Sequence, residues 1–307
     1  MQTWMYNYDI KKTTEAQKLR KEERKMKKII SIILTLTLIC GALFALSSCG
    51  ATKYEIAVQS GTTAEYFVNG DADWEFDGIS GFTAKCYDNG GLAVTDLKNG
   101  VVKYAMIDEQ PAKALVKTIS GVKVIDIPLT VEEYAFGVDK NQPQLLADIN
   151  AVIAEIKANG TLTAIVEKYA TNSPDIAPIE SASFDASRAD KQLVIATNAE
   201  FSPFEYKDGN KFAGIDMEIM KYVADKLGLE IVIMDMKFEA VVESVGKNGI
   251  DIAVSGLTVN EKRKEFVNFT DTYYNASQLL IVAENDTSFD SCKTADDVIA
   301  VLEGKVK

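Results

Sequence analysis

The chain of 307 residues is 47% hydrophobic and 25% charged, carries a formal net charge of −12 and contains no histidine. This composition is typical of a globular protein long enough for two domains, and the acidic excess disfavours binding to nucleic acid and to anionic lipid headgroups. The absence of histidine excludes serine and cysteine hydrolases with a histidine base, and most zinc sites. We expect no enzyme activity, no metal and no cofactor, with carboxylate or lysine chemistry as the remaining route to an enzyme.

Residues 1–48 predict an export signal. A basic MKK stretch at 26–28 precedes an apolar run over residues 29–46. About 18 apolar residues would also suffice for a transmembrane helix, but a short apolar run with a positive flank and small residues before a cleavage point is typical of a signal peptide. The sequence LSSC, ending at Cys49, resembles the bacterial lipobox, which implies diacylation of Cys49 and extracytoplasmic attachment to the membrane. Residues 1–25 then form an N-terminal extension of the signal region.

Beyond the signal, short apolar or β-branched runs alternate with helical patterns. The runs lie at residues 56–58, 104–107, 123–127, 193–197, 231–234 and 251–255. This alternation predicts an α/β protein with parallel sheets. Two amphipathic helices are expected at 143–159 and 215–227, each followed by a glycine (Gly160, Gly228) that can adopt the left-handed C-cap conformation. Residues 171–190 are rich in Pro, Ser, Ala and Asp without periodicity, and predict a linker.

Two segments offer the groups that a free amino acid requires. Burying this zwitterion needs a cation with aligned donors for the carboxylate and an anion for the ammonium. In SGLTVNEKR (255–263), Gly256 admits close approach, Thr258 can donate from its N–H and hydroxyl, and the forked guanidinium of Arg263 suits a carboxylate. In SGTT (60–63), which follows a strand and opens a helix, the N–H of Thr63 can face the same anion.

An acid and two aromatic residues complete this set. Asp108 ends the run that begins at residue 104 and is placed for the ammonium, while Phe201 and Phe238 each follow a predicted strand, where loops meet a cleft. Taken singly, Arg263 is more often a surface arginine, Asp108 a strand-end cap and each phenylalanine a core residue. Their combination around two α/β lobes favours a ligand site.

The segment GIDMEIMKYVADKL (214–227) resembles the signature of the polar amino acid family of bacterial extracellular solute-binding proteins, the receptors of ABC importers. The resemblance covers residues 54–170 and 191–307. It implies a type II periplasmic-binding-protein fold, in which two α/β lobes joined by two hinge strands close over an L-amino acid.

The resemblance also implies a role for individual residues. Those implied are Arg263, Thr258 and the N–H of Thr63, with Thr62 beside it, for the α-carboxylate; the Gly256 carbonyl and Asp108 for the α-ammonium; Phe201 and Phe238 for stacking on the ligand; and Asn198, Glu200 and Gln59 for side-chain specificity. No residue is expected to be catalytic or to bind a metal.

The order of the two segments departs from the family. In the family, the segment that corresponds to 191–307 precedes the one that corresponds to 54–170, so the chain resembles a circular permutant closed by the linker. We expect lobe 2 at residues 54–131 and 278–307, lobe 1 at residues 137–272 with the linker included, and hinge segments at 132–136 and 273–277. Cys86 and Cys292 then share lobe 2, their spacing matches no metal pattern, and the sequence leaves open whether they pair.

These observations predict a lipid-anchored extracytoplasmic receptor that binds a polar or basic L-amino acid by cleft closure and delivers it to an ABC transporter permease. One alternative is a dehydratase-type enzyme on the same fold, with Glu200 or Asp108 as the acid, although an enzyme that acts on a carboxylated ring needs no ammonium partner. A second is a ligand-sensing lipoprotein without transport. For the assembly, the alternative is a truncated tandem fusion whose halves pair between molecules.

Overall fold

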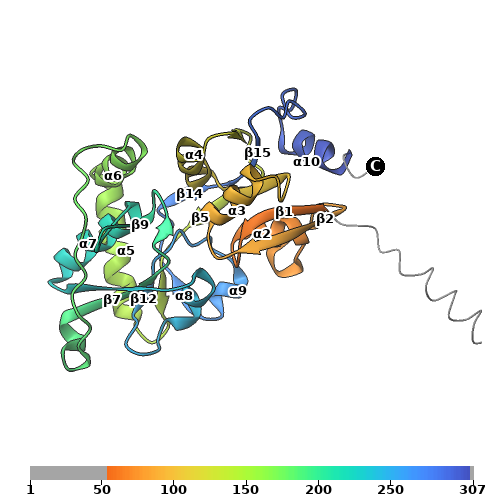
Figure 1. Cartoon of the computed structure of the whole chain (residues 1–307). Helices are drawn as coiled ribbons and strands as arrows, with labels where there is room; N and C mark the ends of the chain where they lie inside the picture. The colour runs from red at the N-terminus through yellow and green to blue at the C-terminus, as the bar shows by residue number, and fades with distance from the viewer. Residues whose placement is uncertain (1–53, 305–307) are drawn as a thin grey trace, which may run out of the picture. The chain divides into compact units, whose positions relative to one another are not determined.

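The computed structural model describes residues 54–304, which form two α/β lobes, each built on a five-stranded sheet (Figure 1). The expected two-lobed fold is confirmed. The signal region 1–48 and Cys49 lie outside the described residues. Within the range 54–304, none of the helices combines the length and the apolar character that crossing a bilayer requires.

The sheet of lobe 2 is mostly formed by the first part of the described chain. Its strands are β1 (Tyr54–Gln59), β2 (Phe82–Tyr87), β3 (Tyr104–Asp108), β4 (Val122–Ile125) and β15 (Gln278–Ala283). Their order is β2-β1-β3-β15-β4, with β1 parallel to β2 and β3. The helices of this lobe are α2 (Thr63–Asn69), α3 (Gly90–Lys98), α4 (Glu109–Thr118) and α10 (Ala295–Gly304). Along β1, Ile56 and Val58 belong to one apolar cluster and Ala57 to another, so both faces of the sheet are covered.

The sheet of lobe 1 has the same number of strands. They are β6 (Gly137–Asp139), β7 (Gln192–Thr197), β11 (Glu230–Asp235), β12 (Ile252–Ala253) and β13 (Val267–Phe269), in the order β11-β7-β12-β6-β13. The helices of this lobe are α5 (Pro143–Ala158), α6 (Thr161–Ala170), α7 (Ile215–Leu227), α8 (Phe238–Ser244) and α9 (Glu261–Lys264). A smaller sheet joins β8 (Glu200–Phe201), β9 (Glu205–Asp208) and β10 (Lys211–Ala213). The two helices expected from the sequence are confirmed as α5 and α7, and Gly160 and Gly228 both have positive φ.

Two short strands carry the chain between the lobes. β5 (Glu132–Tyr134) leads from lobe 2 into β6, β14 (Tyr274–Ala276) leads from lobe 1 into β15, and the two pair antiparallel. Immediately after each crossing, β6 runs antiparallel to β12 and β13, and β15 runs antiparallel to β3 and β4. The expected parallel pairing holds for β1 with β2 and β3 and for β7 with β11 and β12. Both sheets are mixed, because each hinge strand delivers the chain into the next sheet from the opposite direction.

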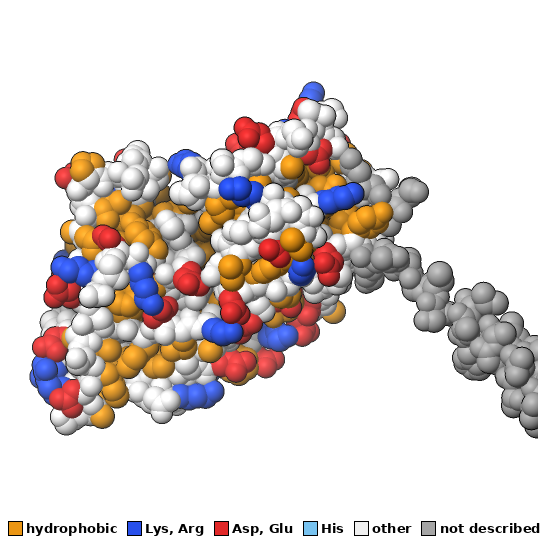
Figure 2. Space-filling view, viewed as in Figure 1, with side chains coloured by type: hydrophobic (Ala, Val, Ile, Leu, Met, Phe, Trp, Pro, Cys, Tyr) orange, Lys and Arg blue, Asp and Glu red, His pale blue; other side chains and the backbone are white. Residues whose placement is uncertain are grey.

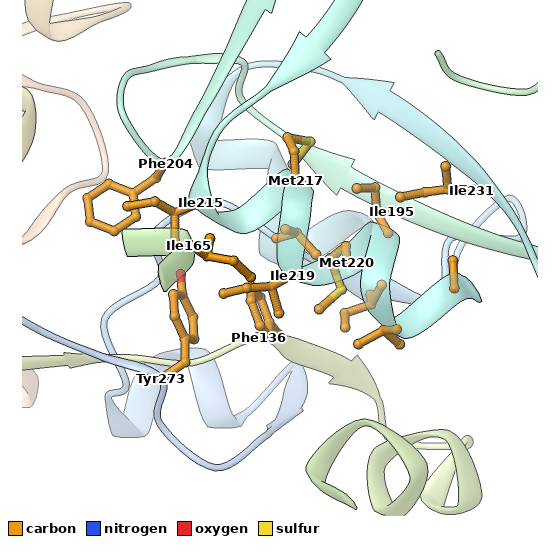
Figure 3. Packing of buried hydrophobic residues seen from close by; sticks show 14 of the residues in the cluster. Phe136, Ile165, Ile195, Phe204, Ile215, Met217, Ile219, Met220, Ile231 and Tyr273 are labelled. Atoms are coloured by element: carbon orange, nitrogen blue, oxygen red, sulfur yellow. The ribbon is translucent and has the colours of Figure 1, made fainter. Parts of the chain in front are cut away.

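The core of lobe 1 packs the α7 helix against the sheet. Ile219 and Met220 of α7 are fully buried with Ile195 of β7, as Figure 3 shows. At the hinge end of the same core, the rings of Phe136 and Tyr273 stack with centroids 4.3 Å apart. The two hinge segments are thus anchored to each other as well as to α7, which makes the hinge a defined structural element.

The segment 171–190 follows the edge of lobe 1. Ile179 exchanges backbone hydrogen bonds with Phe212, at 2.7 and 2.9 Å, and the N–H of Ala182 donates to the carbonyl of Ile231. The thiols of Cys86 and Cys292 are both free, so they do not pair. On the face shown in Figure 2, acidic and basic side chains are intermingled.

Candidate ligand-binding site

One small hollow between the lobes gathers most of the expected site residues. It has a volume of only about 10 Å³ and is lined by Thr62, Thr63, Asp108, Phe201, Phe238, Gly256, Thr258 and Arg263. All eight were singled out from the sequence, and they come from both lobes. Ligand pockets usually measure about 300 to 1,000 Å³, so the lobes lie close together in this conformation.

Arg263 is a buried cation on the wall of the hollow. It lies on the short helix α9, whose N-terminus is capped by Asn260, and its side chain is only 9% exposed. Nη1 donates to the carbonyl of Thr258 at 2.8 Å and Nη2 to the carbonyl of Gly61 at 3.1 Å. Burial lowers the pKa of the guanidinium. Within residues 54–304 it forms no ion pair, so an anion that enters the hollow would supply its missing counter-charge.

Two aromatic rings hold the guanidinium from opposite lobes. The carbon Cζ of Arg263 lies 5.2 Å from the ring centroid of Trp74 and 5.4 Å from that of Phe238. Trp74 ends a single 3-10 turn (Ala72–Trp74) in lobe 2 and stacks on Tyr66 with centroids 4.5 Å apart. Sequence reasoning missed Trp74, because the segment around it shows no periodic pattern that would place it near residue 263.

Asp108 provides a negative group on the same hollow. It ends β3 at the start of α4, is 5% exposed, and accepts a hydrogen bond from the hydroxyl of Tyr134 at 2.5 Å. Burial raises the pKa of Asp108 to about 7, and the nearby Glu132 carboxylate adds to the increase. A ligand ammonium would favour the charged form and so lower this pKa again.

Glu132 is a second buried carboxylate that sequence reasoning assigned only to the hinge. Its Oε2 accepts hydrogen bonds from the hydroxyls of Thr63 and Thr258, both at 2.6 Å, and its Oε1 accepts from Thr130 at 2.6 Å and Gln278 at 3.1 Å. No local pattern in the sequence LTVEEYAF marks this residue, since the apolar Val131 beside it is exposed and Glu132 is buried.

Gly256 occupies a position that only glycine fits. Its φ is +48°, and an added Cβ would lie 2.9 Å from Cε1 of Phe201 and 3.2 Å from Cε2 of Tyr134. Its N–H donates to Asp216 at 2.9 Å, and Asp216 also accepts from the hydroxyl of Tyr273 at 2.6 Å. Burial raises the pKa of Asp216 to about 7. The first turn of α7 therefore supports the loop 255–258 from below.

The three residues expected to set side-chain specificity do not line the hollow. Nε2 of Gln59 donates to Oδ1 of Asn198 at 3.0 Å across the lobes, and Oε1 of Gln59 is buried without a partner. Glu200 is exposed and accepts from Nδ2 of Asn89 at 2.9 Å, also across the lobes. These side chains therefore bridge the two lobes, and Glu200 lines a separate hollow together with Phe201 and Ile107.

The threonines at the start of α2 turn their hydroxyls away from a ligand. Thr62 donates its hydroxyl to the carbonyl of Gln59 at 2.7 Å, and Thr63 donates its own to Glu132. The N–H of Thr62 also donates to the carbonyl of Gln59, at 3.4 Å, so the N–H of Thr63 is the donor of this turn that is left for a carboxylate. In the part of the chain that the structure describes, no group of His, Cys, Asp and Glu side chains is arranged to hold a metal ion.

Comparison with known proteins identifies related sequences. Residues 12–172 and 193–303 match the family described as bacterial extracellular solute-binding proteins, family 3. The arginine-binding extracellular protein ArtP of Bacillus subtilis is 38% identical over 103 residues, which are 34% of this chain and 40% of ArtP. A probable histidine-binding protein of Campylobacter jejuni is 30% identical over 113 residues, or 37% of this chain and 41% of that protein. The chain thus spans about two fifths of the length of these relatives.

Solved structures overlap the chain only in part. The arginine-bound form of truncated ArgBP from T. maritima is 35% identical, covering 27% of this chain and 39% of its own, with a TM-score of 0.24. A variant of an ancestral cyclohexadienyl dehydratase is 26% identical, covering 27% of this chain and 37% of its own, also with a TM-score of 0.24.

Proposed function

The chain belongs to the bacterial extracellular solute-binding proteins, family 3, and from this membership we propose that it binds one L-amino acid between its lobes and delivers it to an ABC transporter permease. The observation that carries the proposal is the buried guanidinium of Arg263, which has no anionic partner in the described chain, on a hollow that also presents the Asp108 carboxylate. A hollow with one group of each sign matches the two charges of a zwitterion.

The groups around the hollow divide between the two ends of the ligand. The free donors of Arg263 and the N–H group of Thr63 receive the α-carboxylate. Asp108 and the carbonyl of Gly256 receive the α-ammonium, and Phe201 and Phe238 enclose the side chain.

We propose a polar or basic side chain for the ligand. Two relatives are named for binding arginine and histidine, and Glu200 offers an exposed carboxylate next in sequence to Phe201 of the hollow, where it accepts from Asn89. A thermal-shift screen of the twenty amino acids tests this: we expect the largest increase in melting temperature from a polar or basic one. If none of the twenty raises it, the proposed function is wrong.

The order of the two segments is a further part of the proposal. The family match is divided into two blocks that meet within 173–192, and each curated relative matches only about a third of the chain, which supports a circular permutation with lobe 2 at 54–131 and 278–307 and lobe 1 at 137–272. A rearranged chain, with residues 191–307 ahead of 54–170, should keep the ligand preference. Loss of binding in a folded rearranged protein would contradict this order.

We also propose a lipid anchor at Cys49 on the outside of the cell membrane. Its support is the sequence alone, since the signal region lies outside the described residues. The change Cys49→Ser should release the protein from the membrane fraction. A dehydratase on this fold would instead turn over prephenate or arogenate, and we expect no turnover of either.

A further inference from the structure

Glu132 occupies a junction between the lobes. It lies on β5, buried between the exposed Val131 and Glu133, and it does not line the hollow. Its four hydrogen-bond donors use both carboxylate oxygens and include no cation. Every polar atom of this buried carboxyl group is therefore satisfied by the fold itself.

The donors come from different lobes. Thr63 of α2, Thr130 and Gln278 belong to lobe 2, whereas Thr258 belongs to lobe 1. Thr63 and Thr258 meet on the same oxygen, Oε2, at 2.6 Å each, and their own hydroxyl oxygens are 3.2 Å apart. The loop that carries Thr258 is joined to β5 by backbone hydrogen bonds, from Ala135 to Leu257 and from Val259 to Glu133. Opening the cleft moves Thr258 away from Thr63, so Glu132 can accept from both hydroxyls only in the closed form.

Resting on the proposed function, we propose that Glu132 is a positioning residue. By accepting hydrogen bonds from Thr63 and Thr258 on one oxygen, it holds the two threonines together and stabilises the closed form. These two hydrogen bonds use the hydroxyl protons of both threonines. Their lone pairs then face outward as acceptors, and their backbone N–H groups remain as donors. Glu132 therefore sets affinity through closure and the orientation of the threonines, without contact with the ligand.

The affinity of Glu132→Gln for two matched ligand pairs tests this role of Glu132. The pairs are L-arginine with 5-guanidinopentanoate and L-histidine with 3-(imidazol-4-yl)propanoate, each differing by the α-amino group. Weakening a charge-assisted hydrogen bond that exists only in the closed form should reduce affinity about 10- to 100-fold, and by the same factor for both members of a pair. Glu133→Gln, an exposed neighbour on the same strand, is the control and should bind as the wild type does. An unchanged affinity overturns the proposal, and so does a loss confined to the amino acids, which would make Glu132 a counter-charge for the ammonium.

A second measurement works without any ligand. If neither pair binds to the wild type, the proposed function fails for these ligands, and small-angle scattering of the ligand-free proteins still decides the role of Glu132. Thr258→Val removes only the donor from lobe 1, whereas Thr130→Val removes a donor to the same carboxylate within lobe 2. If Glu132 stabilises the closed form in this way, we expect a larger radius of gyration for Thr258→Val and Glu132→Gln, and the wild-type radius for Thr130→Val. Equal radii for Thr258→Val and the wild type, or equal opening by Thr130→Val, would overturn it.

Discussion

Replacing Arg263 by alanine should separate ligand binding from stability. The guanidinium has five N–H donors, and two of its nitrogens donate to the carbonyls of Thr258 and Gly61, so donors remain for a ligand carboxylate. Breaking a buried, hydrogen-bonded charge pair by removing one partner costs roughly 2 to 5 kcal/mol. The expected loss of affinity is therefore about 30- to 5,000-fold.

The stability of the ligand-free protein should respond differently. Without a ligand, Arg263 is a buried cation that forms no ion pair in the described chain and feels the carboxylates of Glu132 and Asp108 only at longer range, so removing it relieves a desolvation penalty. The change also removes the contacts with the rings of Trp74 and Phe238, worth about 0.5 to 2 kcal/mol each. Because these two effects oppose each other, we expect the ligand-free melting temperature of Arg263→Ala to stay near that of the wild type.

Calorimetry and thermal denaturation together check this reasoning. Titration gives the affinity, and melting curves with and without ligand give the stabilisation, which should disappear in Arg263→Ala. Arg263→Lys is the matched control, since it keeps the charge but not the planar fork, and an intermediate affinity is expected. Wild-type affinity in a folded Arg263→Ala protein would refute the role of Arg263, and unfolding of that protein would show a structural residue.

Four further predictions concern the same hollow. Asp108→Asn should weaken binding of an amino acid but largely spare its des-amino analogue, because only the ammonium loses its counter-charge; calorimetry with both ligands checks this, and equal losses would make Asp108 structural. Since the pKa of Asp108 is about 7 in the ligand-free site and the ammonium requires the ionised form, affinity should rise with pH below about 7 and level off above it, a dependence that Asp108→Asn should flatten. The same raised pKa means that the folded, ligand-free protein binds more protons than the unfolded chain between about pH 4 and 7. The contribution of Asp108 to the free energy of unfolding should therefore fall as pH rises through this range. Denaturant unfolding of the wild type and Asp108→Asn at several pH values checks this, and a difference between the two that stays constant with pH would contradict it. Gly256→Ala should lower the free energy of unfolding by about 1 to 3 kcal/mol, since its Cβ would meet Phe201 at a positive φ, and wild-type denaturant curves would contradict the strain.

The charged residues of the hollow could be found from the sequence because each lies in a short local motif. Arg263, Thr258 and Gly256 share one loop, and Asp108 ends a strand whose apolar run is plain in the sequence. The carboxyl ends of such strands meet at one edge of a sheet, so local patterns were enough to bring these residues together.

Residues that act across the lobes could not be found in this way. Glu132 lies 126 positions from Thr258 and 69 from Thr63, and Trp74 reaches Arg263 from a single 3-10 turn. Their roles arise from long-range packing that no local pattern records. The hinge strands also reverse the direction of β6 and β15, which the alternation of strands and helices could not show.

The structure of the protein with its bound amino acid tests the central claim most directly. The account predicts that the ligand carboxylate accepts hydrogen bonds from the Arg263 guanidinium and from the N–H group of Thr63, while the ammonium donates to Asp108 and to the carbonyl of Gly256. A ligand bound elsewhere, with Arg263 still bonded only to the carbonyls of Thr258 and Gly61, would contradict it.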